Sequence, residues 1–375
     1  MLDWTRRQFL AGAAAAAAAV PVRAAPSATV AVSRIRTYGD ELVSELESMF
    51  DRLGGLGRLV KGKTVAIKIN LTGAPSYRVG HSPAELAHWT HPRVIGATVH
   101  LMGRAGARRV RLLESPWSTA DPLEEYMLEA GWDPSDLLNA AGRVEMENTN
   151  WLGGASKYSR LPVPGGGHMF SAFDLNQSYE DCDVFVSIAK LKEHATTGVT
   201  LSMKNCFGIT PCTIYGEGAG KEEPSLLPRG GRGMLHQGHR QPSASAPPEK
   251  DPASPRAGGY RVPRIVADLV AARPIHLAIV DGIESMASGE GPWIPGVRRN
   301  SPGVLIAGTN CVATDAVAAA VMGFDPMADR GSAPFERCDS TLRLAADHGI
   351  GLRDPRHIEV VGVPIAKARY PFRAP

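Results

Sequence analysis

The sequence predicts an α/β protein with a layered, mostly parallel β-sheet, helices on both faces and one long Pro/Gly-rich insertion. Strand-like and helical segments alternate along the chain, and most of the strand-like runs are continuously apolar, as expected for strands covered on both faces. The balance of 43% hydrophobic and 21% charged residues is that of an ordinary globular protein. We expect one domain over residues 26–375.

Seven segments predict strands because they are rich in β-branched residues. They are residues 29–35, 64–71, 108–114, 183–189, 276–282, 303–309 and 357–362. The segments between them predict helices, and prolines at two helix starts fit this assignment. The predicted helices are residues 40–53, 92–105, 122–130, 200–207, 263–272, 311–322 and 333–347. This alternation favours parallel strand pairing.

Residues 213–262 interrupt the alternation. They include seven prolines and nine glycines and show no periodicity long enough for a helix or strand. Such a stretch buries too little apolar surface to offset its ordering entropy, so we expect a long surface loop. Its role is open between a functional lid and an inert insertion.

The first 25 residues predict a twin-arginine signal peptide. Arg6 and Arg7 precede an alanine-rich apolar run and small residues suited to cleavage after Ala24 or Ala25. We therefore expect a periplasmic or otherwise exported protein whose partner during export is the twin-arginine translocase. An ordinary secretory signal or a helical anchor is the alternative. No later stretch has about 18 consecutive apolar residues, so no transmembrane segment is expected in the mature chain.

Composition and motifs exclude several classes of function. The net charge of +3 is small and the basic residues are scattered, so no nucleic-acid partner is expected. Five cysteines without a Cys-x-x-Cys repeat predict no iron-sulfur cluster. The spacing of Cys206 and Cys212 leaves a disulfide between them open. The chain has no Walker motif, dinucleotide fingerprint or Gly-x-Ser-x-Gly elbow.

Polar residues follow several predicted strands, where open parallel sheets bind their ligands. The densest cluster is KLKEHATTGVTLSMKN, residues 190–205. Lys190, Lys192 and His194 are two residues apart, so an extended strand projects them from one face. A helix start after this strand would add free backbone amides and favour a carboxylate or phosphate. Desolvation could also lower a lysine pKa enough to make that lysine a base.

These positions give a predicted site at one edge of the sheet. The predicted catalytic residues are Lys190, His194, Lys204 and Asp281, and the predicted substrate-binding residues are Lys68, Asn70, Lys192, Thr200 and Asn205. Asp281 and Asp315 are also predicted ligands for a divalent metal. Each has a simpler alternative: Asp281 begins an Asp-Gly turn, and Asp315 complements a helix dipole. A solvated lysine-rich edge is the simpler alternative for the lysines.

The blocks VAIKINLTG, KLKEHATTGVTLSMKNCFGITP, IVDGIESMASGEGP and VLIAGTNCVATDAVAAAVMGFDP resemble, in this order, the domain of unknown function 362 family, over residues 65–326. The family's activity is not established. The resemblance implies a twin-arginine-exported bacterial member. Many members carry an appended ferredoxin-like domain; this sequence lacks its cysteine motifs, so electron transfer by that route is not implied. Asn310 stands where the family usually has aspartate.

Together these observations predict an enzyme that acts on a small anionic or polyhydroxylated molecule. The lysines would bind the anionic group, His194 would act as acid or base, and Asp281 and Asp315 would position a metal or a lysine. The alternative is a non-catalytic periplasmic protein that binds an anion or handles a cofactor in the same pocket.

Overall fold

The computed structural model describes residues 28–373, so the predicted signal peptide lies outside the described residues. A ten-stranded sheet with the order β12-β1-β11-β9-β7-β2-β3-β4 forms the centre, β10 pairs with β9, β8 pairs with β7, and β5 and β6 form a separate pair. The strands are β1 (Ala28–Arg34), β2 (Thr64–Lys68), β3 (Arg109–Glu114), β4 (Val144–Asn148), β5 (Tyr158–Pro162), β6 (Ala172–Asn176), β7 (Val184–His194), β8 (Gly198–Val199), β9 (Leu277–Ala287), β10 (Arg298–Asn300), β11 (Val304–Gly308) and β12 (Ile358–Gly362).

The predicted fold class is confirmed. Strands β9, β7, β2, β3 and β4 run parallel to one another, and β12 is parallel to β1. Antiparallel pairing of β11 with β1 and with β9 makes the sheet mixed. The parallel strands therefore end along one edge, where the sequence places its polar residues.

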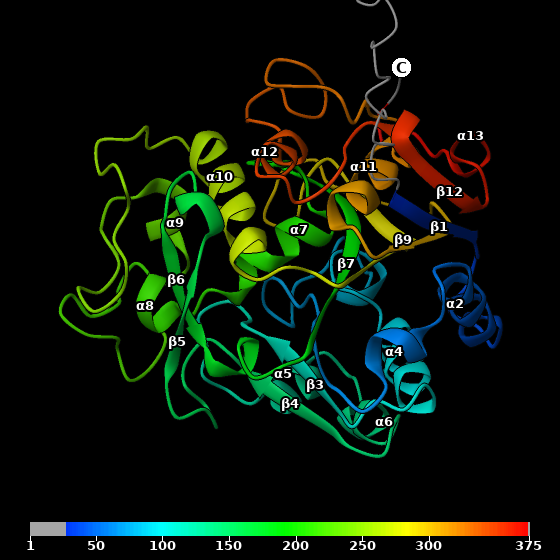
Figure 1. Cartoon of the computed structure of the whole chain (residues 1–375), viewed down its shortest axis with the longest axis horizontal. Helices are drawn as coiled ribbons and strands as arrows, with labels where there is room; N and C mark the ends of the chain where they lie inside the picture. The colour runs from blue at the N-terminus through cyan, green and yellow to red at the C-terminus, as the bar shows by residue number, and fades with distance from the viewer. Residues whose placement is uncertain (1–27, 374–375) are drawn as a thin grey trace, which may run out of the picture.

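Helices cover both faces of the sheet (Figure 1). The helices are α2 (Glu41–Arg52), α3 (Leu56–Val60), α4 (Pro92–Arg104), α5 (Leu123–Glu129), α6 (Pro134–Leu138), α7 (Leu201–Asn205), α8 (Cys212–Tyr215), α9 (Gly233–Gln237), α10 (Gly258–Ala272), α11 (Cys311–Val321), α12 (Thr341–Asp347) and α13 (Ile365–Ala368). Helices α2 to α6 pack on one face, and α7, α10, α11 and α12 pack on the other.

The two apolar cores follow from the side-chain alternation of the strands. In β2, Val65 and Ile67 face the core beneath α2 to α6, while Ala66 faces the core beneath α7, α10 and α11. In β7, Val186 likewise faces the core beneath α2 to α6, and Phe185 faces the core beneath α7, α10 and α11. Because successive side chains of a strand point to opposite faces, a continuously apolar strand supplies both cores.

All seven predicted strands are present, and each predicted helix overlaps a helix of the structure. The largest boundary difference is in the helix predicted from residue 333, which begins at Thr341. The Ser340 side chain accepts a hydrogen bond from the Arg343 amide and caps the helix there, whereas Pro334 lies in a turn. The short strands and helices that the sequence did not predict have too few residues for a periodic pattern.

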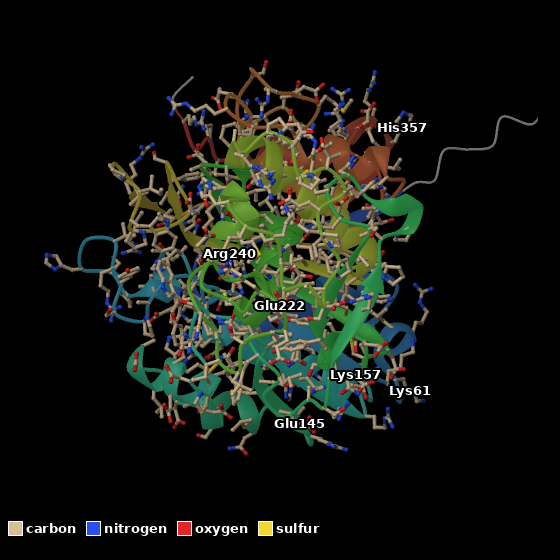
Figure 2. The ribbon with its side chains drawn as sticks, turned by 90° about the vertical axis from the view of Figure 1, so that its left-hand side faces the viewer. Lys61, Glu145, Lys157, Glu222, Arg240 and His357 are labelled. Atoms are coloured by element: carbon tan, nitrogen blue, oxygen red, sulfur yellow. The ribbon has the colours of Figure 1, made fainter. Side chains whose placement is uncertain are left out.

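The Pro/Gly-rich segment 213–262 runs beside the β5–β6 pair and is mostly irregular, as expected, although it includes α9 and the first turn of α10. Figure 2 looks onto this side of the molecule and labels two of its charged residues, Glu222 and Arg240. Arg261 and Glu249 form a buried ion pair of 2.5 Å. The Lys250 amide donates to the Met169 carbonyl at 2.9 Å. These contacts tie the segment to the body of the domain.

Two further expectations concern membranes and cysteines. Among residues 28–373, no helix combines the length and the apolar character that a membrane crossing requires. All five cysteines are free thiols, so Cys206 and Cys212 are not joined.

Candidate functional site

A cavity of about 420 Å³ lies where the parallel strands β2, β3, β7 and β9 end. Most of its wall comes from the ends of these strands and the segments that directly follow them, as the binding rule for open α/β sheets predicts. Seven of the residues predicted from the sequence line it: Lys68, Asn70, Lys192, His194, Thr200, Lys204 and Asn205. The structure therefore brings together most of the predicted substrate-binding and catalytic side chains.

Lys68 is held in a buried network at one side of the cavity. Its Nζ lies 2.6 Å from Glu114 Oε1 and donates to the Ile69 carbonyl at 2.6 Å and to Asn205 Oδ1 at 3.2 Å. The Asn205 amide in turn donates to Ser187 Oγ at 3.0 Å. Glu114 neutralises the Lys68 charge, so this pair shapes the cavity wall and adds little net charge to it.

Lys192 reaches the cavity from β7. Its Nζ donates to the His88 carbonyl at 2.8 Å and to the Glu290 carbonyl at 2.9 Å, which leaves one of its three N–H donors for a ligand. Burial lowers the pKa of Lys192 to about 7, with Glu290 opposing and the charges of Lys204 and Lys190 adding to the decrease. Both the ammonium form and the neutral amine of Lys192 are therefore accessible near neutral pH.

Lys204 projects into the cavity from α7. Its Nζ lies 4.5 Å from the centre of the Phe207 ring, a cation–π arrangement. Burial lowers its pKa to about 7, partly opposed by Glu290. Within residues 28–373, no carboxylate oxygen lies in ion-pair distance of this ammonium group. Lys68 is paired with Glu114 and Lys192 donates to two carbonyls, so Lys204 is the cavity lysine best placed to pair with a bound anion.

His194 is neutral in this setting. Burial, followed by the charges of Lys204, His236 and Lys192, lowers its pKa well below the usual value. Its Nδ1 accepts a hydrogen bond from the Thr196 amide at 3.1 Å, so the neutral ring carries its proton on Nε2. His194 is thus a neutral hydrogen-bond donor to whatever occupies the cavity.

Three aromatic side chains form an aromatic rim at the cavity: Tyr77, Trp117 and Trp293. Their ring centroids are 5.9 to 6.1 Å apart in pairs, and each side chain is at least 36% exposed. Trp117 and Trp293 also line the cavity. Trp117 has a φ of 36°, a conformation that bulky residues rarely adopt. Exposed aromatic rings beside buried lysines give the cavity both an apolar and a cationic part.

Residues 65–320 match the model of a family described as a domain of unknown function (DUF362). The chain belongs to the DUF362 family. It is also 28% identical over 185 residues to the thylakoid-associated protein sll1697 of Synechocystis sp. (strain ATCC 27184 / PCC 6803 / Kazusa), covering 49% of this chain and 51% of that protein. The DUF362 chain thus aligns with about half the length of this curated relative.

Two solved structures are distantly similar to this DUF362 protein. The lactate racemase apoprotein of Thermoanaerobacterium thermosaccharolyticum matches with a TM-score of 0.36 and 10% identity, over 73% of this chain and 54% of that chain. A Thermotoga maritima protein from a structural genomics consortium matches with a TM-score of 0.38 and 14% identity, over 73% of this chain and 56% of that chain.

Lys190 and Asp281 were predicted to be catalytic, but in this DUF362 domain neither lines the cavity. They stand opposite each other in the parallel pair β7 and β9, and Lys190 Nζ lies 2.9 Å from Asp281 Oδ2. The Tyr38 hydroxyl donates to Asp281 and accepts from Lys190. The prediction that Lys190 and Lys192 reach one site is therefore corrected. Lys190 forms an ion pair with Asp281 of the neighbouring strand β9, whereas Lys192 lines the cavity.

The predicted metal ligands Asp281 and Asp315 are not brought together. Asp315 Oδ1 accepts hydrogen bonds from the amide and hydroxyl of Ser202, and its Oδ2 accepts from the Met203 amide. Burial raises the pKa of Asp315 to about 7, and these bonds oppose the increase. Asp315 therefore caps the start of α7, the helix that carries Lys204. Within residues 28–373, three side chains able to bind a metal gather elsewhere, at His168, Asp268 and His348.

The structure also adds cavity residues that were not predicted: Glu114, Trp117, Arg232, His236, Glu290 and Trp293. Glu114 could have been predicted, because it is a polar residue at the end of the predicted strand 108–114. Glu290 and Trp293 lie in an irregular loop after β9, and Arg232 and His236 lie in the Pro/Gly-rich segment, so no periodicity marked them. This segment therefore supplies part of the cavity wall.

Proposed function

We propose that this DUF362 protein is an enzyme that binds a small anionic molecule in the cavity and moves a proton on it. The observation that carries the proposal is the placement of Lys192 and Lys204 in one cavity, each with a pKa of about 7. Because efficient acid–base groups have a pKa near the working pH, these lysines are suited to hold an anion when protonated and to accept a proton when neutral.

The balance of charge supports an anionic ligand. The charged residues that line the cavity are four basic ones, Lys68, Lys192, Lys204 and Arg232, and two acidic ones, Glu114 and Glu290. Glu114 is committed to Lys68. A carboxylate or phosphate near Lys192 and Lys204 would relieve their repulsion and raise their pKa.

We assign distinct roles to three side chains. Lys204, whose ammonium group has no ion-pair partner among the described residues, is the acid–base group. Lys192, held by two carbonyls, positions the anion through its remaining N–H. His194 donates its Nε2 proton to a ligand oxygen and so stabilises charge that develops there. The proposal leaves Lys190, Asp281 and Asp315 in structural positions.

The aromatic rim supports a ligand with a ring or another apolar part. Tyr77, Trp117 and Trp293 present ring faces and edges beside the cationic part of the cavity. Aromatic side chains stack on planar rings and on the C–H faces of sugars. An aromatic carboxylate, or an acidic sugar, matches both parts of the cavity.

Solvent exchange tests this proposal. The full mature chain would be incubated in D₂O with small carboxylates that carry an α C–H bond, with and without an aromatic ring, and deuterium incorporation followed by NMR. We expect exchange at the α-carbon of a bound carboxylate and a loss of at least ~100-fold in Lys204→Met. His194→Ala should reduce exchange while its ligand affinity stays within about tenfold.

The same experiment separates the enzyme from a non-catalytic anion-binding or cofactor-handling protein. Tight binding without exchange for every bound carboxylate favours the binding protein. An equal loss of affinity and exchange in His194→Ala also contradicts the assigned role. Lys61→Met, a change at an exposed lysine labelled in Figure 2, is the matched control and should change neither quantity.

We also propose export through the twin-arginine pathway, on the strength of Arg6, Arg7 and the apolar run that follows them. The double variant Arg6→Lys/Arg7→Lys should accumulate in the cytoplasm of a bacterial host, whereas Arg23→Lys should be exported as the parent is. Fractionation and immunoblotting measure the outcome. Export of the double lysine variant at the parental level would contradict this route.

A further inference from the structure

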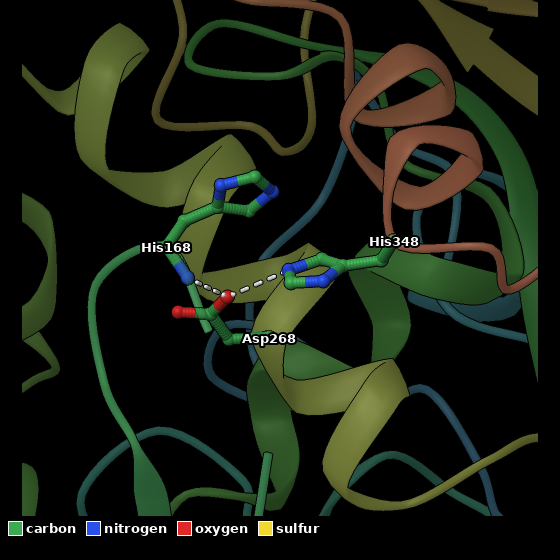
Figure 3. Close-up of side chains that lie close together, drawn as sticks. All are labelled: His168, Asp268 and His348. Carbon is green, nitrogen blue, oxygen red and sulfur yellow. Dashed lines mark hydrogen bonds and ion pairs between the residues drawn. The ribbon is translucent and has the colours of Figure 1, made fainter. Parts of the chain in front are cut away.

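A second group of chemically active side chains lies away from the cavity. His168 comes from the loop before β6, Asp268 from α10, and His348 directly follows α12. Figure 3 shows the His348 imidazole and the His168 backbone amide against the Asp268 carboxylate, with the His168 imidazole next to the His348 ring. One ligand atom of each residue lies within 4.8 Å of the other two. None of the three lines the cavity, so this group is independent of the proposed function.

The carboxylate of this group is fixed in place. Asp268 Oδ1 accepts the His168 amide at 2.6 Å, and Oδ2 accepts the amides of Met169 at 2.6 Å and Phe170 at 3.0 Å. Gly167 makes this turn possible with a φ of +63°, and a Cβ there would lie 2.1 Å from the Phe170 carbonyl oxygen. A metal ligand that is hydrogen-bonded by its surroundings keeps its orientation.

A structural hydrogen bond explains only part of the group. His348 Nε2 lies 3.2 Å from Asp268 Oδ1, and a partly buried hydrogen bond accounts for this pair. His168 Nε2, in contrast, is buried and has no hydrogen-bond partner among the described residues. Burying a polar nitrogen without a partner is costly, so such an atom needs an explanation. The pair of Asp268 and His348 does not provide one.

The spacing of the group fits a small metal ion. Ligands of a tetrahedral ion at about 2.0–2.2 Å lie roughly 3.3–3.6 Å from one another. The separation between His348 Nε2 and Asp268 Oδ1 is already 3.2 Å, and the two imidazole rings are 4.1 Å apart between centroids.

We propose that His168, Asp268 and His348 form a binding site for a divalent transition metal, with Zn²⁺ as the first choice. Two imidazoles and one carboxylate are a ligand set for Zn²⁺ and for neighbouring first-row ions. The three side chains supply three ligands, so water would complete a tetrahedral set. The ion would join the loop before β6 to α10 and α12.

Zinc binding by the full mature chain tests the site. After treatment with a chelator and its removal, Zn²⁺ titration by calorimetry should give one ion per chain. His168→Ala and His348→Ala should each weaken this binding by at least ~100-fold. His357→Ala, at an exposed histidine labelled in Figure 2, should bind as the parent does. Co²⁺ substitution should give visible absorption bands that disappear in the two site variants.

Thermal unfolding provides a second readout. Zn²⁺ should raise the Tm of the parent and of His357→Ala, and this increase should vanish in His168→Gln, whose smaller polar side chain limits the disturbance of folding. Circular dichroism confirms that each variant folds. Absence of stoichiometric Zn²⁺ binding by the parent overturns the proposal. Unchanged Zn²⁺ affinity in folded His168→Ala and His348→Ala also overturns it.

Discussion

Lys190 Nζ lies 2.9 Å from Asp281 Oδ2, and neither side chain is exposed to solvent. The two residues are 91 positions apart in the sequence and become neighbours only when β7 pairs with β9. Burial lowers the pKa of Lys190, and the charge of Asp281 and its hydrogen bond oppose that decrease. The pair joins β7 to β9 in the middle of the sheet.

Breaking this ion pair should destabilise the fold. Lys190→Met or Asp281→Asn should each lower the free energy of unfolding by about 3–5 kcal/mol, because either change leaves a buried group without its partner. The double variant should lose less than the sum of the two single variants. Urea unfolding measures the cycle. Arg343→Met, which breaks exposed contacts, should cost no more than ~1 kcal/mol, and additive losses in the cycle would contradict coupling.

Loss of the Asp315 cap should loosen the helix that carries Lys204. Asp315→Asn replaces an accepting oxygen with an NH₂ group that faces amide or hydroxyl donors, and we expect a loss of about 1–3 kcal/mol in the free energy of unfolding. Asp347→Asn, at an exposed carboxylate, is the control and should change stability by less than ~0.5 kcal/mol. Equal stability of Asp315→Asn and the parent would show that the cap is dispensable.

Anion affinity should decrease as the pH rises through about 7. Lys192 and Lys204 each have a lowered pKa of about 7, and an anion prefers their protonated forms, so binding takes up protons above this pH and not well below it. Sulfate and benzoate keep their charge between pH ~6 and ~9. Calorimetry should give affinities that fall by up to tenfold per pH unit for each lysine.

In Lys204→Met the affinity should fall less steeply with pH, because one titrating lysine is lost. In Lys61→Met the slope of affinity against pH should equal that of the parent. Affinity that rises with pH, or a slope unchanged in Lys204→Met, would contradict the assigned role of Lys204.

The aromatic rim should select ligands that carry a ring. Trp293→Ala should reduce the affinity for benzoate by about 3- to 10-fold and leave acetate affinity nearly unchanged, because only the ring contacts the rim. Trp293→Phe should retain most of the preference. Leu226→Ala removes an exposed apolar side chain elsewhere and is the control. Equal losses for benzoate and acetate in Trp293→Ala would show that Trp293 does not recognise the ring.

Sequence patterns were sufficient for the sheet and for the edge that holds the cavity. Strands β2 and β7 are marked by their apolar runs, and Lys68 and Lys192 lie at their ends because a chain leaves a buried strand with its first polar residues. The spacing of Thr200 and Lys204 likewise placed both on one helical face, and both line the cavity. These relationships extend over a few residues, so local periodicity determines them.

The partners of those residues were decided by the tertiary structure. The two-residue spacing of Lys190 and Lys192 predicts that they share a strand face. Only the pairing of β9 with β7 places Asp281 beside Lys190, whereas Lys192 lines the cavity. His168, Asp268 and His348 meet because a loop and two helices pack together, and no spacing connects them. A buried charge takes the partner that folding places beside it. Periodicity fixes which face a side chain occupies, whereas long-range packing decides what it meets there.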